Sequence, residues 1–268
     1  YSLTGDTSEQ CIFVCYGAGR NGKSTLLEAV GRALGDYAAN CQPETLMVRP
    51  AGGVNSDLAR LAGARFVTSA EPAAGMQLNE SLVKQLTGGD RVTARRLYGH
   101  EFEFTPSFKL WLSTNHLPRI QGGDEGIWRR IRLIPFSVTL PEDAVDPHLP
   151  DKLAAEAPGI LAWAVEGCLR WRAEGLRPPD AVREATDGYR EQCDALQPFF
   201  RACCRLEGRA TARDLYDAYV AWCDGTGQPP VNQLRFGRYL GGRFIRKKVK
   251  GNAVYAGVSL AGGEEGEG

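Results

Sequence analysis

Short apolar runs, separated by helical patterns, occupy the first half of the 268-residue chain. β-branched and aromatic residues are frequent in these runs, which is typical of buried strands. The runs are Cys11–Tyr16, Arg65–Glu71, Phe108–Asn115 and Arg132–Phe136. After the first run, Leu26, Leu27 and Val30 form an apolar stripe at helical spacing, and Gly35 is a suitable helix stop. The pattern predicts an α/β core.

The segments between these runs are less regular. Asp36–Pro50 is punctuated by prolines and is expected to be irregular. Asn55 or Ser56 can cap a short helix that Gly63 ends. Asn79–Leu86 follows a helical pattern and predicts a further helix.

Two short alternating runs, Arg91–Arg95 and Glu101–Phe104, predict a β-hairpin after the tight turn Thr87–Asp90. Basic side chains flank an aromatic one at its tip, and this combination suits phosphate contacts and base stacking. The tip residues are Arg95, Arg96, Tyr98 and His100. A charged hairpin tip is also common as plain solvated surface, so both interpretations stay open here.

Helical patterns dominate the second half of the chain, which ends in a predicted hairpin. Ser137–Pro150 is punctuated by prolines and is expected to be a linker. The predicted helices are Pro158–Ala173, Asp180–Cys193, Thr211–Asp224 and Gln233–Leu240. Phe244–Lys250 and Ala253–Ser259 then flank a Gly-Asn turn and predict a two-stranded hairpin. Helices followed by a hairpin is the order of a winged helix.

A glycine-rich loop joins the first predicted strand to the first predicted helix. Gly17–Ser24 fits G-x-x-x-x-G-K-[ST] at every fixed position. Backbone N–H groups of such a loop converge on phosphate oxygens, and the helix N-terminus adds a favourable partial charge. Lys23 can reach the β- and γ-phosphates, and the Ser24 hydroxyl can bind Mg²⁺. The loop therefore predicts a nucleoside-triphosphate site with ATP and Mg²⁺ as cofactors. Its expected nucleotide contacts are Gly17, Ala18, Gly19, Arg20, Asn21, Gly22, Lys23, Ser24 and Thr25.

Polar side chains end two further predicted strands. Glu71 is the only acidic residue between Asp57 and Glu80. An acid in this position completes the Mg²⁺ shell or polarises the attacking water, so Ser24 and Glu71 are the predicted metal ligands. Asn115 can hydrogen-bond a water or the γ-phosphate beside the loop.

Two adjacent arginines, Arg129 and Arg130, precede the fourth predicted strand. An arginine finger stabilises the charge that develops on a transferred phosphoryl group. Adjacent side chains cannot both face one site, so at most one of the two is expected to act as a finger. A surface salt bridge is the alternative for the other.

Basic and acidic residues number 32 each, and the formal net charge is zero. Any nucleic-acid surface must therefore be a local patch. Val231–Leu260 contains seven basic residues and no acidic one, which indicates such a patch. A solvated basic wing is the alternative. The predicted DNA contacts in this segment are Arg235, Arg238, Arg246, Lys247, Lys248 and Lys250.

Composition favours a soluble intracellular protein. No apolar run approaches the roughly 20 residues needed to cross a bilayer. The eight cysteines include no C-x-x-C pair and mostly have apolar neighbours, as reduced core cysteines do, so a zinc site is not expected. The first residue is Tyr rather than Met, and we expect the sequence to be a fragment of a longer chain.

In combination, these motifs resemble the superfamily-3 helicase module of phage and plasmid primase-helicases, a group similar to the poxvirus primase-helicase. The resemblance extends from the glycine-rich loop to Leu260. It also includes Phe66–Glu71, Lys84–Asp90 with Ala94-Arg95, Phe108–Asn115 and Trp128–Ile131. One departure is that Glu71 stands alone where many P-loop enzymes carry two adjacent acids, which leaves its metal and water roles undivided.

The resemblance implies an AAA+-like P-loop ATPase core followed by helices and a small winged-helix domain. It implies a Mg²⁺-dependent DNA helicase that forms a hexameric ring and moves 3′ to 5′ on single-stranded or forked DNA. Lys23, Glu71 and Asn115 would act within one subunit, while Arg129 or Arg130 would reach the neighbour's nucleotide. Replication of a phage, plasmid or mobile element in the cytoplasm of a bacterial host is the implied setting, and a primase domain could lie upstream.

We therefore expect an ATPase domain at 1–137, a linker and helical segment at 138–195 and a winged-helix-like DNA-binding domain at 196–260. The acidic, glycine-rich residues 261–268 are expected to be a disordered tail. Two other functions remain. A replication initiator or loader would bind DNA and use ATP as a conformational switch without unwinding. A P-loop kinase is disfavoured by the paired arginines and the basic C-terminal patch.

Overall fold

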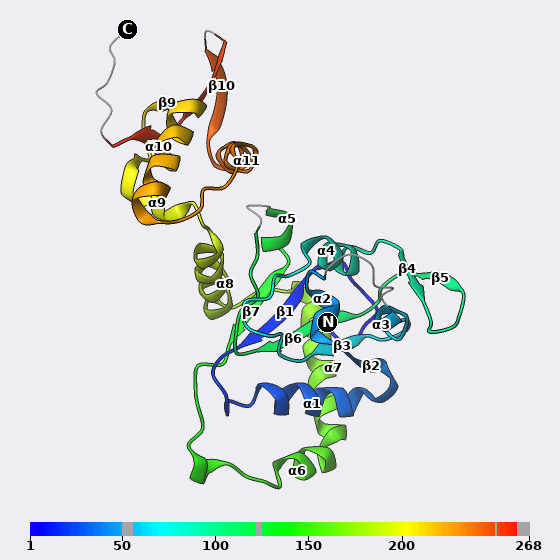
Figure 1. Ribbon diagram of the computed structural model, residues 1–268. Helices are drawn as coiled ribbons and strands as arrows, with labels where there is room; N and C mark the ends of the chain where they lie inside the picture. The colour runs from blue at the N-terminus through cyan, green and yellow to red at the C-terminus, as the bar shows by residue number, and fades with distance from the viewer. Residues whose placement is uncertain (50–55, 122–124, 250, 262–268) are drawn as a thin grey trace. The chain divides into compact units, whose positions relative to one another are not determined.

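The chain divides into two compact units, Tyr1–Arg190 and Glu191–Gly268, and Figure 1 colours them in chain order. A computed structural model describes residues 1–49, 56–121, 125–249 and 251–261. Each unit has a hydrophobic core of its own. The division falls at Arg190, so most of the helical segment expected at 138–195 belongs to the first unit.

A five-stranded sheet forms the centre of the first unit, with the strand order β2-β3-β6-β1-β7. All neighbouring strands run parallel. The strands are β1 Ile12–Tyr16, β2 Ala38–Cys41, β3 Phe66–Ser69, β6 Lys109–Thr114 and β7 Ile131–Pro135. Ile12, Val67 and Leu112 are fully buried, as expected of a parallel sheet covered on both faces. The predicted α/β core and its four predicted strands are confirmed.

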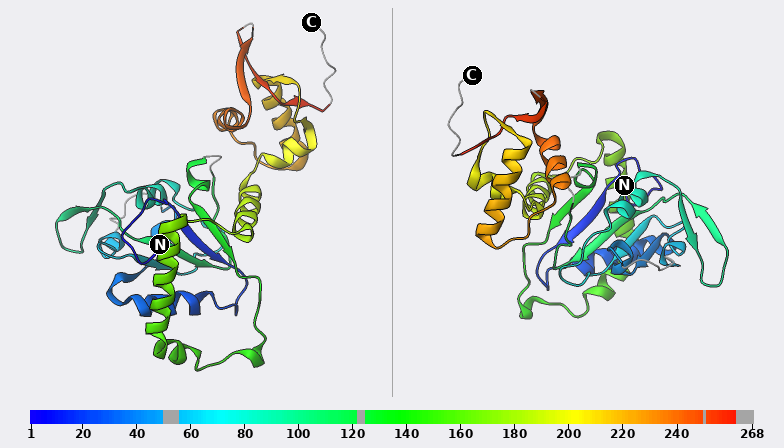
Figure 2. Two further views of the ribbon diagram at one scale, coloured as in Figure 1. Left: turned by 180° about the vertical axis from the view of Figure 1, so that it is seen from behind. Right: turned by 45° about the horizontal axis from the view of Figure 1, so that its top comes forward.

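Helices of the first unit pack around this sheet. Leu27 packs with Cys15 and Phe66 against one sheet face, and α7 crosses α1 in contact with it (Figure 1, and from behind in Figure 2). None of the helices in the described ranges is long and apolar enough to cross a membrane. The helical elements are α1 Lys23–Leu34, η1 Gly35–Tyr37, α2 Pro43–Leu46, α3 Ser56–Ala59, α4 Glu80–Gly88, α5 Glu125–Trp128, η2 Glu142–Ala144, α6 Leu149–Ala155, α7 Ala157–Glu174 and α8 Asp180–Cys193, whose end passes the unit boundary.

Two details differ from the sequence predictions. Asp36–Pro50 was expected to be irregular, but it contains β2 and α2. The strand β2 consists of small and polar residues and depends on pairing with β3, a long-range contact that local propensity does not reveal. Leu26, predicted in the buried stripe, is 40% exposed, because successive residues of a helix point about 100° apart and Leu27 takes the core-facing position. Gly35 ends α1 as predicted.

The predicted hairpin is confirmed as β4 Val92–Arg95 paired antiparallel with β5 Glu101–Phe104. It forms a separate two-stranded sheet and extends away from the central one (Figure 1). Val92 and Ala94 are buried at its base, whereas its tip is exposed. Buried and exposed residues alternate along β4, as the pleat of a strand requires.

The N-terminal segment, residues 1–10, lies against the amino end of β6, a position that the sequence pattern did not predict. Lys109 is almost fully buried and donates hydrogen bonds through Nζ to the carbonyl oxygens of Thr4 and Asp6, the latter at 3.0 Å. Burial lowers the pKa of Lys109 to about 8. Glu9 accepts from the Trp171 indole N–H at 2.7 Å. The segment therefore joins β6 to α7.

The second unit is built from short helices and antiparallel strands. Its main sheet has the order β10-β11-β9, and β12 pairs with β8. The Thr211 and Asn232 side chains cap α10 and α11 by accepting from Asp214 N and Arg235 N, which explains where these helices begin. The elements are α9 Gln197–Cys203, β8 Cys204–Arg205, β9 Arg209–Thr211, α10 Ala212–Thr226, α11 Gln233–Arg243, β10 Ile245–Val249, β11 Asn252–Ala256 and β12 Ser259–Leu260.

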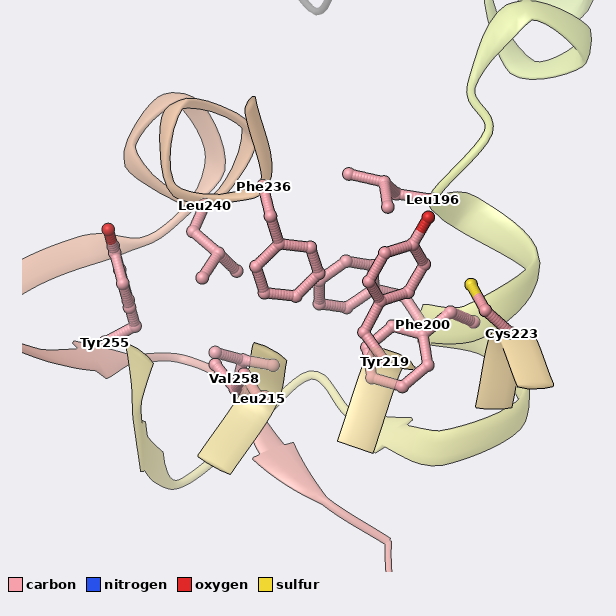
Figure 3. Packing of buried hydrophobic residues seen from close by; sticks show 10 residues of the cluster. Leu196, Phe200, Leu215, Tyr219, Cys223, Phe236, Leu240, Tyr255 and Val258 are labelled. Atoms are coloured by element: carbon pink, nitrogen blue, oxygen red, sulfur yellow. The ribbon is translucent and has the colours of Figure 1, made fainter. Parts of the chain in front are cut away.

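Aromatic side chains dominate the core of the second unit. Figure 3 shows Phe200, Tyr219 and Phe236 converging between α9, α10 and α11. Tyr219 and Phe236 stack with ring centroids 5.0 Å apart, and Leu215 and Leu240 are fully buried beside them. The two predicted helices and the hairpin are confirmed, and β9 adds a third strand that was not predicted. Because β9 pairs with β11, it connects one edge of the β10–β11 hairpin to the helices.

Candidate nucleotide site

The glycine-rich loop connects β1 to α1, and contacts from distant residues fix its shape. Asn21 Nδ2 donates to Phe136 O at 3.1 Å and also to Ala18 O within the loop. Leu140 N donates to Arg20 O at 2.8 Å. A β-carbon added at Gly17 would lie 2.1 Å from Phe136 O, so only glycine fits where the loop passes this backbone.

Gly17→Ala is therefore expected to lower the free energy of unfolding by about 1–3 kcal/mol, the usual range for overpacking. Gly19→Ala is the matched control, because an added β-carbon there meets nothing within 4 Å. Urea unfolding of both variants checks this prediction. Equal stabilities would contradict the close approach of the loop to Phe136.

The loop presents a row of backbone donors. Within the described residues, the N–H groups of residues 18–25 have no protein acceptor, whereas Gly17 N donates to Thr114 O at 3.3 Å. Gly22 has φ 85° and is the N-cap of α1, so the loop ends directly at the helix N-terminus. Unpaired N–H groups at a helix N-terminus are the usual partners of phosphate oxygens. The loop residues therefore fit a nucleotide phosphate chain.

Lys23 lies at the centre of the site and is only 5% exposed. Its ammonium donates to Gly17 O at 2.7 Å, Asn21 Oδ1 at 2.9 Å and Asn115 Oδ1 at 2.9 Å. Burial lowers the pKa of Lys23 below its usual value, and the nearby Glu71 carboxylate partly offsets this effect. The side chain is thus a positive charge held at the loop by neutral acceptors.

Glu71 and Asn115 form a two-point contact beside Lys23. Glu71 Oε1 accepts from Asn115 N at 3.0 Å, and Glu71 Oε2 accepts from Asn115 Nδ2 at 3.0 Å. Asn115 therefore joins the carboxylate to the lysine. The three residues follow β3, β6 and β1, whose carboxyl ends meet at the edge of a parallel sheet where such folds bind ligands.

An open cavity of about 330 Å³ lies next to this network, between α1 and the strands β2, β3 and β6. The polar part of its lining includes Ser24, Glu28, Asn40, Thr68 and Ser113. No cluster of three or more His, Cys, Asp or Glu residues within the described ranges could hold a metal ion. A cation here would therefore depend on Ser24, Glu71 and phosphate oxygens, which is the ligand set that Mg²⁺ prefers.

The two predicted finger candidates differ in their surroundings. Arg130 is 7% exposed and donates to Thr87 Oγ1 at 3.1 Å and Gly126 O at 2.6 Å, so it is packed inside the first unit. Arg129 is exposed. Gln10 Oε1 accepts from both guanidinium groups, at 3.1 Å from Arg129 and 3.3 Å from Arg130.

The predicted DNA contacts lie on exposed surfaces of both units. Tyr98 is 97% exposed with φ 60° at the tip of the β4–β5 hairpin, next to the exposed side chains of Arg95, Arg96 and His100. In the second unit, the basic surface consists of Arg235, Arg238, Arg246, Lys247 and Lys248, all exposed on α11 and β10. Lys250, also predicted, lies outside the described residues.

The sequence pattern did not reveal two supports of the site. Gln10 precedes β1 without any motif, and its φ of 47° is unusual for a residue other than glycine. Phe136 contributes only its backbone carbonyl to the loop. Backbone contacts of this kind leave no residue-type signal, so only the structure reveals them.

The comparisons with known proteins match the part of the chain that carries this site. A model described as "Family of unknown function (DUF5906)" matches residues 15–130, which include the loop, Glu71 and Asn115. A putative helicase of Acanthamoeba polyphaga mimivirus is 33% identical over 74% of the chain, and a putative helicase of Frog virus 3 (isolate Goorha) is 30% identical over 87%. The chain spans only 22% and 27% of these two relatives.

Two further comparisons extend this relationship. A putative primase of African swine fever virus is 30% identical over 46% of the chain and 13% of its own length. The apo structure of the NrS-1 C-terminal region has a TM-score of 0.55 at 14% identity, covering 94% of this chain and 67% of that one. The chain is thus similar in sequence to putative viral helicases and primases, and it shares its mixed α/β fold with the NrS-1 C-terminal region.

Proposed function

We propose that this chain is the ATP-hydrolysing module of a DNA helicase that acts in replication of a virus, plasmid or related mobile element. Residues 17–25 bind the phosphates of ATP, Ser24 and Glu71 hold Mg²⁺, and Lys23 and Asn115 contact the γ-phosphate. Arg129 acts on the nucleotide of a neighbouring subunit in a hexameric ring. The ring moves 3′ to 5′ on single-stranded DNA, and a primase domain upstream would complete the protein.

One observation carries this proposal. Lys23, Asn115 and Glu71 come from three separate parts of the sequence, yet they form one hydrogen-bonded network beside the unpaired N–H groups of the loop. A cation, a polarising carboxylate and an amide at a phosphate cradle are the groups that phosphoryl transfer to water requires. The similarity to putative helicases supports DNA as the partner of this site.

The ATPase rate per subunit, measured against protein concentration with and without single-stranded DNA, tests the proposal. A mass measurement in solution accompanies it. A rate that rises with concentration and with DNA is expected, because sites shared between neighbours are complete only in an assembly. A rate that depends on neither protein concentration nor DNA would indicate a self-contained site and would overturn the proposal of a ring.

The basic surface of the second unit is proposed to hold the DNA backbone. Arg238, Arg246, Lys247 and Lys248 have no carboxylate partner within the part of the chain that the structure describes. Phosphate contacts of this type give affinity that falls steeply with salt.

The double variant Lys247→Glu/Lys248→Glu is expected to weaken single-stranded DNA binding about tenfold and to reduce the slope of log affinity against log salt by about one per lost contact. Arg205→Glu, an exposed arginine of β8 outside this surface, is the control with the same type of charge reversal. Fluorescence anisotropy at several salt concentrations measures both quantities. Equal salt slopes for the two proteins would contradict the assignment.

The same basic surface also supports a second candidate, a replication initiator or loader in which ATP acts as a switch. Such a protein would bind DNA through the second unit and would change its DNA affinity with the bound nucleotide. A strand-separation assay on forked DNA distinguishes the two. Nucleotide-dependent DNA binding without strand separation would favour the loader.

A further inference from the structure

A second pocket, lined by several arginines, lies in the first unit, at the edge of the sheet that β7 forms. Its volume is about 240 Å³, and it opens between α5, the start of β7 and α8. Four arginines and two carboxylates contribute to its lining, together with apolar residues that include Trp128 and Val182. The charged residues are Glu125, Arg129, Arg132, Arg183, Asp187 and Arg190.

This pocket is distinct from the nucleotide site of its own subunit. Arg132 pairs in register with Phe13 near the start of β1, whereas the glycine-rich loop follows Tyr16 at the opposite end of that strand. Leu133 N donates to Thr186 Oγ1 at 3.0 Å, which fixes α8 beside β7. The pocket is therefore formed within the first unit, at the amino end of the sheet.

Ion pairing leaves an excess of positive charge in the pocket. Arg190 binds Glu125 at 2.5 Å, and Arg183 binds Asp180 outside the lining. Arg129 and Arg132 have no carboxylate partner among the residues that the structure describes. The Asp187 carboxylate opposes part of this excess, but it is one carboxylate against the two guanidinium groups of Arg129 and Arg132.

Arg132 supplies a second, independent observation. Its NH1 donates to Arg129 O at 2.7 Å and Ile131 O at 3.1 Å, which holds the side chain in place. Its Nε, in contrast, is buried and has no hydrogen-bond partner. A buried donor without an acceptor is destabilising, and an anion that reached this nitrogen from the pocket would supply the missing acceptor.

We propose that this pocket binds a phosphate group. Guanidinium groups offer planar pairs of donors that match phosphate oxygens, and several of them around one small cavity favour a multiply charged anion over a single carboxylate. Arg132 is the fixed donor at the base of the pocket, and the exposed Arg129 and Arg183 close around the anion. The phosphate belongs either to a nucleotide of a neighbouring subunit or to the DNA backbone.

The test uses inorganic pyrophosphate as the probe and Lys23→Ala as the background, so that the glycine-rich loop contributes less to binding. Calorimetric titration is expected to show an affinity that falls about tenfold in Lys23→Ala/Arg132→Gln and in Lys23→Ala/Arg183→Gln. Arg172→Gln, an exposed arginine of α7 outside the lining, is expected to change nothing in this background. Equal affinities in all four proteins would overturn the proposal.

Two features keep this test decisive. Arg183 is exposed, so its substitution preserves the fold even if Arg132→Gln lowers stability, and thermal melting checks both. Pyrophosphate binding also requires no hydrolysis, so the result is independent of the proposed helicase activity. In the otherwise wild-type protein, Arg183→Gln lowers the concentration-dependent ATPase rate if the phosphate is a neighbour's nucleotide. It lowers DNA affinity instead if the phosphate belongs to DNA.

Discussion

Lys23→Ala is expected to lower the rate of ATP hydrolysis about 10³-fold or more. Loss of a single neutral donor from a preorganised site costs about 10²–10³ in rate, and Lys23 is a charged donor that is only 5% exposed. In the structure its ammonium is held by acceptors of the loop and by Asn115 Oδ1. In the proposed nucleotide site, this ammonium would neutralise charge on the β- and γ-phosphates.

Steady-state phosphate release measures this effect, with Lys152→Ala as the control. Lys152 belongs to the same unit and forms an exposed ion pair with Asp146 at 2.6 Å, so its loss is expected to leave hydrolysis unchanged. Removing the Lys23 ammonium also leaves the acceptors of the loop without their donor. Thermal melting of Lys23→Ala therefore shows whether a lower rate comes from lost catalysis or from lost stability. A Lys23→Ala protein that is folded and hydrolyses ATP at the wild-type rate would refute the nucleotide site.

The sequence was sufficient to predict that Lys23, Glu71 and Asn115 lie together at this site, but not their supports Gln10 and Phe136. Lys23 belongs to a contiguous motif, and Glu71 and Asn115 each follow an apolar run that became a parallel strand. Parallel strands place their carboxyl ends at one edge, so polar residues just beyond those ends come together even when they are far apart in sequence. The shared edge explains why these residues lie close together, and the structure adds the partners, with Asn115 joining Glu71 to Lys23.

The parts that could not be predicted depend on long-range backbone contacts. The strand β2 exists because β3 pairs with it, and the shape of the loop depends on the carbonyl of Phe136. The N-terminal segment is held by Lys109, whose side chain reaches Thr4 O and Asp6 O. None of these contacts has a residue-type signature, because carbonyl oxygens are present at every position of the chain.

The adjacent arginines are a second case that the sequence alone could not resolve. Sequence placed Arg129 and Arg130 side by side, and both were candidates for one role. Burial separates them, because Arg130 is enclosed by Thr87 Oγ1, Gly126 O and Gln10 Oε1, whereas Arg129 is exposed. A guanidinium that must reach a neighbouring subunit has to start from the surface, so we propose Arg129 as the finger.

Arg129→Ala is therefore expected to lower hydrolysis about 10³–10⁵-fold under conditions where subunits assemble, the usual contribution of an arginine finger. The glycine-rich loop and Lys23 stay intact in the Arg129→Ala protein, so each subunit is expected to retain nucleotide binding. Mixing Arg129→Ala with Lys23→Ala subunits is expected to restore part of the rate. A site that has a complete loop on one subunit can then receive Arg129 from the next.

Arg130→Ala provides the contrast that makes this result interpretable. It removes a buried guanidinium group and its hydrogen bonds to Thr87 Oγ1 and Gly126 O, and hydrogen bonds to charged groups contribute about 1.5–3 kcal/mol each, so a lower thermal stability is expected. Any loss of hydrolysis in Arg130→Ala comes from damage within its own subunit, and Lys23→Ala subunits cannot repair it. If mixing rescued Arg130→Ala and not Arg129→Ala, the buried arginine would be the finger and the assignment by exposure would be wrong.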